Sequence, residues 1–419
     1  MKKISIFLIV ILTITLSSCK DKYIEIFVAN SPIYMSYETL RQSVKQTDAR
    51  VLENPGKIYF KDDYIFVVEK MKGIHIINNS DSSNPEILTF IEIPGNVDIA
   101  IKGNVLYADS YIDMVAIDIS DLSDIKEVNR VEGILPYTLP PTDEDYPIAQ
   151  IDEEKGVVIA WETKKVRQVV DNNYYPFYKM EGDLIMPSSF GNYGGISITG
   201  IGVGGSMARF GIKDNILYAV DVAQLHILNI STPADPESLG DFYVGWSVET
   251  MFILDDNMFF GTQSGMLVYD ISSPTCPIYI STFWHMTCCD PVVVKDTIAY
   301  VTLRGGNMCG NNLNELDVIS IADLLNPTLL KVYPMAGPYG LGIDDNILFV
   351  CDGDAGLKIY DASDPLTIDE NMLAHFPNIQ AYDVIPINGI LILICEDGIY
   401  QYDYQDIENI QLLSKIDIG

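Results

Sequence analysis

The chain is poor in histidine and in basic residues, and these shortages exclude several kinds of function. Four histidines in 419 residues leave little material for a histidine-rich metal site. Lys and Arg number 26 against 58 Asp and Glu, a formal net charge of −32, whereas nucleic-acid binding needs basic surface that displaces counterions. The same charge argues against electrostatic docking on anionic lipid. The sequence contains no visible nucleophile triad, no Cys–His pair with catalytic spacing and no HExxH motif, so we predict that the protein is not an enzyme.

Two glycine-containing stretches look like ligand loops, but each lacks part of the pattern. GIGVGG (200–205) is not followed by Lys-Ser/Thr and does not open a helical pattern, so we expect no nucleotide there. DGDAG (352–356) offers oxygen ligands at alternate positions, as calcium loops do, but has no downstream bidentate Glu. We therefore predict no cofactor and no metal site, with calcium at this turn as the open alternative.

The N-terminus has the pattern of a bacterial lipoprotein export signal. Lys2 and Lys3 precede an apolar run from Ile4 to Leu16, which suits a signal peptide and is short for a membrane span. The run leads into LSSC, where cleavage would leave Cys19 to carry the lipid. We predict a signal peptide over 1–18 and a lipid-anchored tether over 19–56, in which YMSYETLRQSV could form one short helix.

Beyond this leader the chain repeats one pattern about every 41 residues, a period typical of propeller blades. In each copy an apolar strand such as MLVYDIS leads to an Asp, Asn or Ser that we call the anchor. The anchors are Asn78, Asp118, Asn229, Asp270, Ser320, Asp361 and Asp403. The long gap between the second and third anchors has room for one more, degenerate copy, which we place in YPIAQIDEEKGVVIAWETKKVRQVVD.

Each copy contains the pattern of four short antiparallel strands. Tight turns of Asp, Asn and Gly, which tolerate positive φ, separate the first two strands. They are Gly103-Asn104, Asp214-Asn215, Asp256-Asn257, Asp345-Asn346 and Asn388-Gly389. The third strand is apolar on both faces, so a neighbouring sheet must cover each face. We therefore predict an all-β fold: a closed β-propeller of four-stranded blades over 57–419, with an insert at about 131–206. Eight blades are favoured, and seven are the alternative.

The third-strand stretches LHILNIS, MVAIDIS, MLVYDIS and LKIYDAS carry a family resemblance. The sequence resembles the LVIVD-repeat family of β-propeller lipoproteins from Bacteroidota-type bacteria. The resemblance implies a propeller, a lipid anchor and surface exposure, and it implies no chemical reaction. An exported chain meets an oxidising compartment, where cysteines can pair, although spacing leaves the connectivity open. The family-like block CDPVVVKDTIAYVTLRGGNMC favours pairing of Cys289 with Cys309.

Two surfaces are candidates for partner binding. The insert carries the aromatic residues Tyr174, Tyr175, Phe177 and Tyr178, which could stack on sugars or anchor a protein, or could form a flap packed on a blade. The second strands end near acidic residues that would crowd one face of a ring, either as a binding rim or as a solvated edge. These residues are Glu69, Asp109, Asp221 and Asp352.

From these features we predict a non-catalytic module that binds a protein or a glycan, or serves as a scaffold. It would be held by its lipid in the cell envelope, in the outer membrane, with an unknown envelope protein or glycan as partner. The alternative is a propeller hydrolase or lyase with carboxylates gathered in the central channel.

Overall fold

The computed structural model describes residues 23–170, 189–190, 203–221, 223–285, 291–305 and 313–419. These residues form two compact units. The smaller contains 23–36 and 139–170, and the larger contains 37–138 and the described residues from 189 onward. None of the helices in the described ranges is both long and apolar enough to span a membrane.

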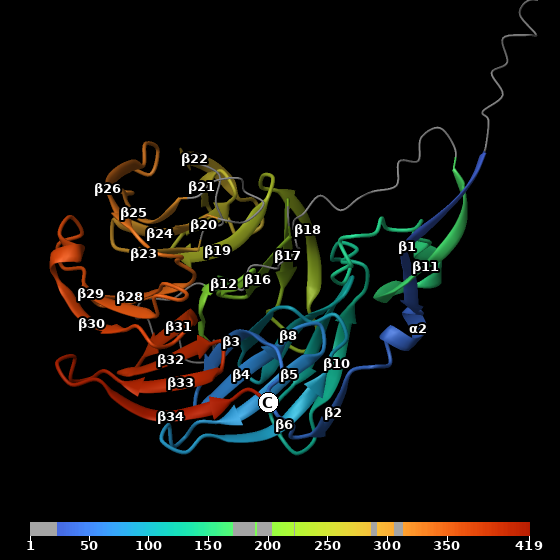
Figure 1. Ribbon diagram of the computed structural model, residues 1–419, viewed down its shortest axis with the longest axis horizontal. Helices are drawn as coiled ribbons and strands as arrows, with labels where there is room; N and C mark the ends of the chain where they lie inside the picture. Colours follow the sequence, from blue (N-terminus) through green and yellow to red (C-terminus); the bar gives the residue numbers. More distant parts are fainter. Residues whose placement is uncertain (1–22, 171–188, 191–202, 222, 286–290, 306–312) are drawn as a thin grey trace, which may run out of the picture. The chain divides into compact units, whose positions relative to one another are not determined.

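The larger unit is a β-propeller with seven blades, so the favoured prediction of eight is wrong. Figure 1 shows the sheets standing around a common centre, with the first strand of each blade innermost and the fourth outermost. Six blades are four-stranded sheets whose strands are hydrogen-bonded in chain order. The first blade has the same four strands plus β13 at its inner edge and β2 at its outer edge.

The strand bounds follow the repeat. The first blade contains β3 Pro55–Lys61, β4 Tyr64–Glu69, β5 Gly73–Asn78 and β6 Glu86–Glu92, and the second contains β7 Ile99–Lys102, β8 Val105–Ser110, β9 Asp113–Asp118 and β10 Lys126–Val131. The third blade contains β15 Phe210–Lys213, β16 Ile216–Val220, β17 Gln224–Asn229 and β18 Glu237–Tyr243. The fourth contains β19 Val248–Leu254, β20 Asn257–Thr262, β21 Gly265–Asp270 and β22 Ile278–Trp284. The last three contain β23 Val292–Lys295, β24 Ile298–Arg304, β25 Asn314–Ser320 and β26 Thr328–Pro334; β27 Leu341–Asp344, β28 Ile347–Cys351, β29 Leu357–Asp361 and β30 Met372–Phe376; β31 Ala381–Ile387, β32 Ile390–Cys395, β33 Gly398–Asp403 and β34 Gln411–Asp417. The short elements outside these quartets are α2 Tyr37–Leu40, β2 Lys45–Asp48, β12 Ser189–Phe190, β13 Val203–Gly204, β14 Ser206–Met207 and the 3-10 turns Glu153–Lys155 and Ile368–Glu370.

The seven anchors identified in the sequence are the last residues of the seven third strands. Each anchor oxygen accepts the backbone N–H two residues further on, which folds the chain into the turn toward the fourth strand. The N···O distances are 3.0 Å at Asn78, 2.8 Å at Asp118, 3.0 Å at Asn229, 2.7 Å at Asp270, 3.5 Å at Ser320, 2.8 Å at Asp361 and 2.9 Å at Asp403. The phase of the repeat is therefore confirmed, and a turn requirement explains the type of residue at the anchor.

The first two strands of every blade are joined by a two-residue turn whose first residue has positive φ. These residues are Asp62, Gly103, Asp214, Asp255, Asp296, Asp345 and Asn388, with φ between 48° and 57°. The predicted turn at Asp256-Asn257 is wrong by one residue, because Asn257 already belongs to β20 and Asp255 takes the strained position.

Apolar side chains fill each interface between neighbouring blades, as the two apolar faces of the third strands predict. The last and first blades close the ring without exchanging a strand. The backbone N–H of Gly419 donates to the Leu52 carbonyl at 2.7 Å, and Gln401 Nε2 donates to Asn79 Oδ1 at 2.7 Å. Beneath these contacts a shared cluster joins Ile58 of β3 to Ile392 of β32. Hydrophobic burial and a few polar contacts thus close the ring.

The smaller unit is a two-stranded antiparallel sheet of β1 (Tyr23–Met35) and β11 (Val157–Val170). β11 is the stretch that we predicted as the degenerate eighth blade. Its apolar residues do belong to a strand, but the partner of this strand is β1 from before the propeller. The Nδ2 of Asn30 donates to the carbonyls of Asp143 and Tyr146, and Tyr34 Oη accepts the Asp152 N–H at 2.7 Å. These hydrogen bonds attach the loop 143–152 to strand β1 within this unit.

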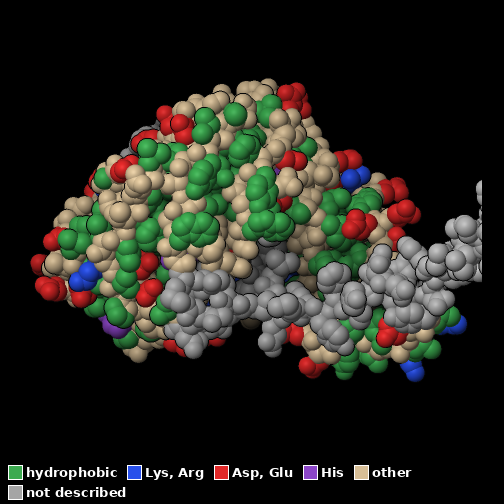
Figure 2. Space-filling model, turned by 90° about the horizontal axis from the view of Figure 1, so that it is seen from above, with side chains coloured by type: hydrophobic (Ala, Val, Ile, Leu, Met, Phe, Trp, Pro, Cys, Tyr) green, Lys and Arg blue, Asp and Glu red, His purple; other side chains and the backbone are tan. Residues whose placement is uncertain are grey.

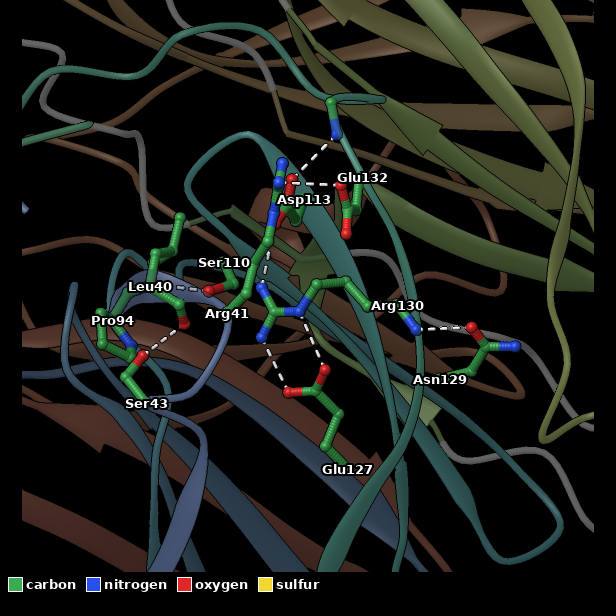
Figure 3. A network of polar contacts seen from close by, with 11 residues as sticks. Leu40, Arg41, Ser43, Pro94, Ser110, Asp113, Glu127, Asn129, Arg130 and Glu132 are labelled. Carbon is green, nitrogen blue, oxygen red and sulfur yellow. Dashed lines mark hydrogen bonds and ion pairs between the residues drawn. The ribbon is translucent and has the colours of Figure 1, made fainter. Parts of the chain in front are cut away.

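Within the propeller, one buried carboxylate binds the two segments through which the chain passes to and from the smaller unit. Asp113 accepts hydrogen bonds from Arg41 Nε at 3.1 Å, Arg130 Nη1 at 3.1 Å and the Gly133 N–H at 2.8 Å (Figure 3). Arg41 also pairs with Glu132 at 2.8 Å, and Arg130 binds both oxygens of Glu127. The segment after α2 and the segment after β10 are thereby fixed to the same blade.

Candidate functional site

One position at the start of each innermost strand varies in charge from blade to blade. It lies four residues before the end of that strand, which is inside the strand in three blades and one residue before it in the other four. The residues are Lys57, Asp98, Arg209, Thr250, Pro291, Gly340 and Asp383. We call this set the channel ring. Its four charged members belong to the first, second, third and seventh blades, and the other three are uncharged.

The chain itself crosses the centre of the propeller inside the channel ring. Val203 and Gly204 pair with the innermost strand of the first blade. Ser206 Oγ accepts the Leu341 N–H of the sixth blade at 3.0 Å and lies 3.5 Å from Asp383 Oδ1 of the seventh. Ser206 and Met207 are 1% and 3% exposed, so this segment fills the channel.

A buried ion pair holds the first blades around this segment. Lys57 Nζ lies 2.5 Å from Asp98 Oδ2, and both residues are 2% exposed. The same carboxylate oxygen accepts the Arg209 N–H at 2.6 Å, which ties the chain leaving the channel to the second blade. Burial lowers the pKa of Lys57, although the neighbouring Asp98 opposes this shift. Because both charges are desolvated, each depends on the other.

Asp383 is the other acid of the channel ring, and no cation pairs with it in the described part of the chain. It is 1% exposed, and its Oδ2 has no hydrogen-bond partner among those residues. Burial raises the pKa of this carboxyl well above its usual range, which favours its protonated form. Gly340 leaves the space for it, because a Cβ there would lie 2.2 Å from Asp383 Oδ1.

Above Asp383 a cavity of about 370 Å³ opens at the face where the innermost strands begin. Its walls come from the first, fifth, sixth and seventh blades, with Met207 of the crossing segment among them. The residues are Glu53, Asn54, Pro55, Gly56, Lys70, Met207, Arg304, Tyr339, Tyr382, Asp383, Ile394, Cys395, Glu396 and Ile418. Its volume lies within the range of small-molecule sites, and its lining is mainly polar and aromatic.

Two cations and two tyrosines of this cavity stand out in so acidic a chain. Burial lowers the pKa of Lys70, and no carboxylate in the described residues forms an ion pair with it. The guanidinium of Arg304 lies 3.9 Å from the centre of the Tyr339 ring. Tyr339 in turn meets Tyr382 edge to face at 5.0 Å. The cavity thus combines positive charge, aromatic surface and a buried carboxyl.

None of these cavity residues was predicted from the sequence, because they come from strand ends and loops of four blades. Aligning the innermost strands on their turns would have brought out the channel ring, and Asp383 with it. Lys70, Arg304 and the two tyrosines leave no such signal, since each is an isolated residue at the end of a strand.

The four predicted rim acids lie at the ends of second strands, and their carboxylates bind the protein itself. Asp109 Oδ1 accepts the N–H groups of Val97 and Asp98 at 2.7 and 3.0 Å, and Asp352 accepts those of Ala336 and Gly337. Asp352 also pairs with Lys358 at 2.6 Å. These contacts hold the loop that enters each blade against its second strand.

Glu69 and Asp221 share a different arrangement, in which a histidine of the third strand faces the acid. Glu69 lies 3.2 Å from His75 Nε2 and accepts the Asn54 N–H at 2.7 Å, and Asp221 lies 3.0 Å from His226 Nε2. Burial would raise the pKa of Glu69, but these hydrogen bonds lower it to about 2. By contrast, burial raises the pKa of Asp109 to about 6.

Comparison with known families rests on the second blade. The LVIVD repeat model matches residues 95–132, which contain all four strands β7 to β10. The chain carries an LVIVD repeat. The LVIVD part of the resemblance inferred from the third-strand motifs is therefore confirmed, and the lipid anchor and the Bacteroidota-type source stay predictions.

Solved structures resemble this LVIVD-repeat propeller in fold alone. The computationally designed Ika8 protein is 12% identical, with a TM-score of 0.50 and 90% of each chain covered. Hsv2 of Kluyveromyces lactis is 9% identical, with a TM-score of 0.48, 89% of this chain covered and 100% of that one. Sqt1 of Saccharomyces cerevisiae is 8% identical, with a TM-score of 0.47 and coverage of 93% and 89%. No curated protein matches the sequence significantly.

Several predicted residues of the LVIVD-repeat chain lie outside the described residues. They are Cys19, Tyr174, Tyr175, Phe177, Tyr178, Cys289 and Cys309. Lipid attachment, the disulfide and the aromatic contact surface therefore stay predictions. Among the described residues Cys276, Cys351 and Cys395 are free, and no group of three or more His, Cys, Asp or Glu is placed to hold a metal.

The drawn surface is acidic and carries apolar patches. Figure 2 shows more acidic than basic side chains, with hydrophobic side chains gathered between them. Exposed apolar residues lie on the outermost strands, among them Tyr243, Ile278, Tyr279 and Leu329. Against this background, the two cations in the cavity are the more informative feature.

Proposed function

We propose that this LVIVD-repeat propeller is a binding module of the cell envelope that holds a glycan in the cavity above Asp383. The observation that carries the proposal is the cavity itself, a concave site with a closed floor, an aromatic pair and unpaired polar groups. Tyrosine faces and fixed hydrogen-bonding groups are what a sugar requires of its site.

A lipid on Cys19 would hold the module at the outer membrane. The charge, length and LSSC ending of the leader support this part of the proposal. Expression of the whole chain in a bacterium with lipoprotein export tests it: the native protein should partition with the membrane fraction and incorporate labelled fatty acid. The Cys19→Ser variant should lose the label, and labelling of that variant would rule out Cys19 as the attachment site.

Binding at the cavity is tested with purified envelope polysaccharide on the immobilised protein. The double variant Tyr339→Ala/Tyr382→Ala should retain much less polysaccharide than the native chain. Tyr279→Ala is a matched control, because this tyrosine is 54% exposed on the outermost strand β22. Equal retention by native and double-variant protein would place glycan binding elsewhere, and no retention by either would reject the proposed function.

A hydrolase or lyase is the second candidate, because Asp383, whose pKa is raised by burial, lines the same cavity as Glu396 and Glu53. A protonated and an ionised carboxyl are the pair that glycoside hydrolysis uses. Release of reducing ends from envelope polysaccharide, lost in Asp383→Asn, would establish catalysis. Intact recovery of the bound polysaccharide after long incubation would favour binding alone.

The aromatic stretch of the insert is the proposed contact for a protein partner. Its deletion should stop before residue 189, because Ser189–Phe190 pairs with Ser206–Met207 inside the ring. A chain that lacks 171–188 would then lose a partner protein while keeping glycan retention and the folded ring. Unchanged partner binding would exclude this stretch.

A further inference from the structure

The cavity holds two cations in positions that folding alone does not explain. Lys70 follows the second strand of the first blade, and Arg304 ends the second strand of the fifth. Lys72, only two residues from Lys70, pairs with Glu53 at 2.5 Å and with Glu69 at 3.6 Å. Carboxylates therefore lie nearby, yet none of the described residues forms an ion pair with Lys70.

An unpaired, partly buried ammonium group costs free energy, which a bound anion would recover. The stem of Lys70 lies against the backbone at Gly56, where a Cβ would come within 3.1 Å of the Lys70 Cγ. On the other wall, the cation–π contact with Tyr339 at 3.9 Å restricts the position of the Arg304 guanidinium. A guanidinium held in this way presents paired N–H groups that suit a carboxylate.

The other groups of the cavity suit hydroxyl groups and the faces of sugar rings. Glu396 is exposed at the cavity wall, and no hydrogen bond to its carboxylate is formed by the described residues, so it can accept from a hydroxyl. Tyr382 contributes an aromatic surface to the lining, next to the buried Asp383. A phosphate or a simple dicarboxylate would leave these groups unused.

We propose that the cavity binds a short acidic saccharide, with the sugar carboxylate held between Lys70 and Arg304 and the ring against Tyr339 and Tyr382. This inference rests on the proposed glycan-binding function and specifies its ligand class. The volume of about 370 Å³ suits a short saccharide better than a length of polymer chain.

Titration calorimetry on the purified whole chain tests the inference with three probes. They are a short oligogalacturonate, a neutral galacto-oligosaccharide of the same length and a short peptide with a free C-terminal carboxylate. We expect only the oligogalacturonate to bind. Lys70→Met and Arg304→Met should each weaken its binding about tenfold to a hundredfold, the size expected for one charge-assisted hydrogen bond.

Lys331→Met is the matched control, because Lys331 also lies beside a tyrosine ring, at 5.5 Å from Tyr333, but on the outermost strand β26. It should bind the oligogalacturonate like the native chain, and thermal melts should show that all three variants fold. Equal binding of the neutral saccharide, or no effect of either cavity variant, overturns the carboxylate assignment. Binding of the peptide alone overturns the saccharide class.

The failure of this inference is distinguishable from failure of the proposed function. If no probe binds while envelope polysaccharide is still retained through Tyr339 and Tyr382, only the acidic-sugar assignment is lost. If the polysaccharide is not retained either, the proposed function fails with it.

Discussion

The seven anchors and the seven residues of the channel ring differ in how far they follow the repeat. Every anchor is Asp, Asn or Ser, and every one accepts a hydrogen bond from the N–H two residues on. The channel ring instead contains lysine, arginine, aspartate, threonine, proline and glycine at equivalent positions. The anchors form the same turn in all seven blades. The residues of the channel ring share one central region, to which each blade contributes one residue.

This difference separates the residues that build a blade from those that act on the whole ring. A local turn needs the same oxygen in each copy, so the repeat preserves it. A channel needs charges that complement one another across blades, as Lys57 and Asp98 do, and a repeat cannot supply complementarity. Changes at the channel ring should therefore cost more than changes at an anchor, and should respond differently to pH.

The largest effect is expected at the buried ion pair. Lys57→Met removes the only side chain that pairs with Asp98 in the described residues, and leaves a buried carboxylate uncompensated. We expect the free energy of unfolding to fall by about 3–5 kcal/mol, as for other broken buried pairs. Urea unfolding followed by circular dichroism measures it.

The double variant Lys57→Met/Asp98→Asn is the control for this prediction. It removes both charges but keeps an oxygen for the Arg209 N–H. It should recover at least half of the stability lost in the single variant. A double variant as unstable as Lys57→Met would mean that packing around the lysine stem, and not the charge on Asp98, holds the blades.

The repeat made most of the blade predictable. Strand order, anchors and turn residues all follow from local requirements that recur with the period, and four of the five predicted hairpin turns needed no correction. The prediction of an eighth blade failed for a physical reason. Apolar stretches such as those of β11 predict a strand, but they do not say which strand pairs with it.

The candidate site was much less predictable. Arg304 and Lys70 are 234 residues apart, and only ring closure brings them to one cavity. The rim acids were placed correctly at the ends of second strands, but their bonds to loop N–H groups could not be read from spacing. Their partners, such as Ala336 and Gly337 for Asp352, lie in connections whose path is set by the tertiary structure.

An intermediate effect is expected at Glu69, whose buried carboxylate takes part in hydrogen bonds that favour its ionised form. Its pKa is about 2 in the folded protein, below its usual 4.5. The stability it contributes is therefore present above pH 4.5 and is lost as the pH falls toward 2. Such a shift corresponds to at most about 3 kcal/mol. In Glu69→Gln, the free energy of unfolding should fall less steeply over this range than in the native chain.

Asp383 provides the contrast, because its folded-state pKa is raised instead of lowered. Its contribution is complete below its usual pKa and is lost as the pH rises toward the folded-state value. Asp383→Asn should therefore flatten the dependence of stability on pH on the neutral side and leave the acid side unchanged. Urea titrations at several pH values measure both limbs. Identical profiles for the two variants would contradict the opposite environments assigned to these carboxyls.

The smallest effect is expected at an anchor. Asp118→Ala removes the acceptor for the Ser120 N–H, at 2.8 Å in the native protein, and leaves that group to water at the exposed turn. One such hydrogen bond stabilises a protein by about 1 kcal/mol, so the variant should lose several-fold less stability than Lys57→Met. Asp118→Asn keeps an acceptor oxygen and should unfold like the native chain. If alanine at this one turn cost as much as breaking the buried ion pair, the anchors could not be local devices, and the contrast between the repeated and the varied positions would fail.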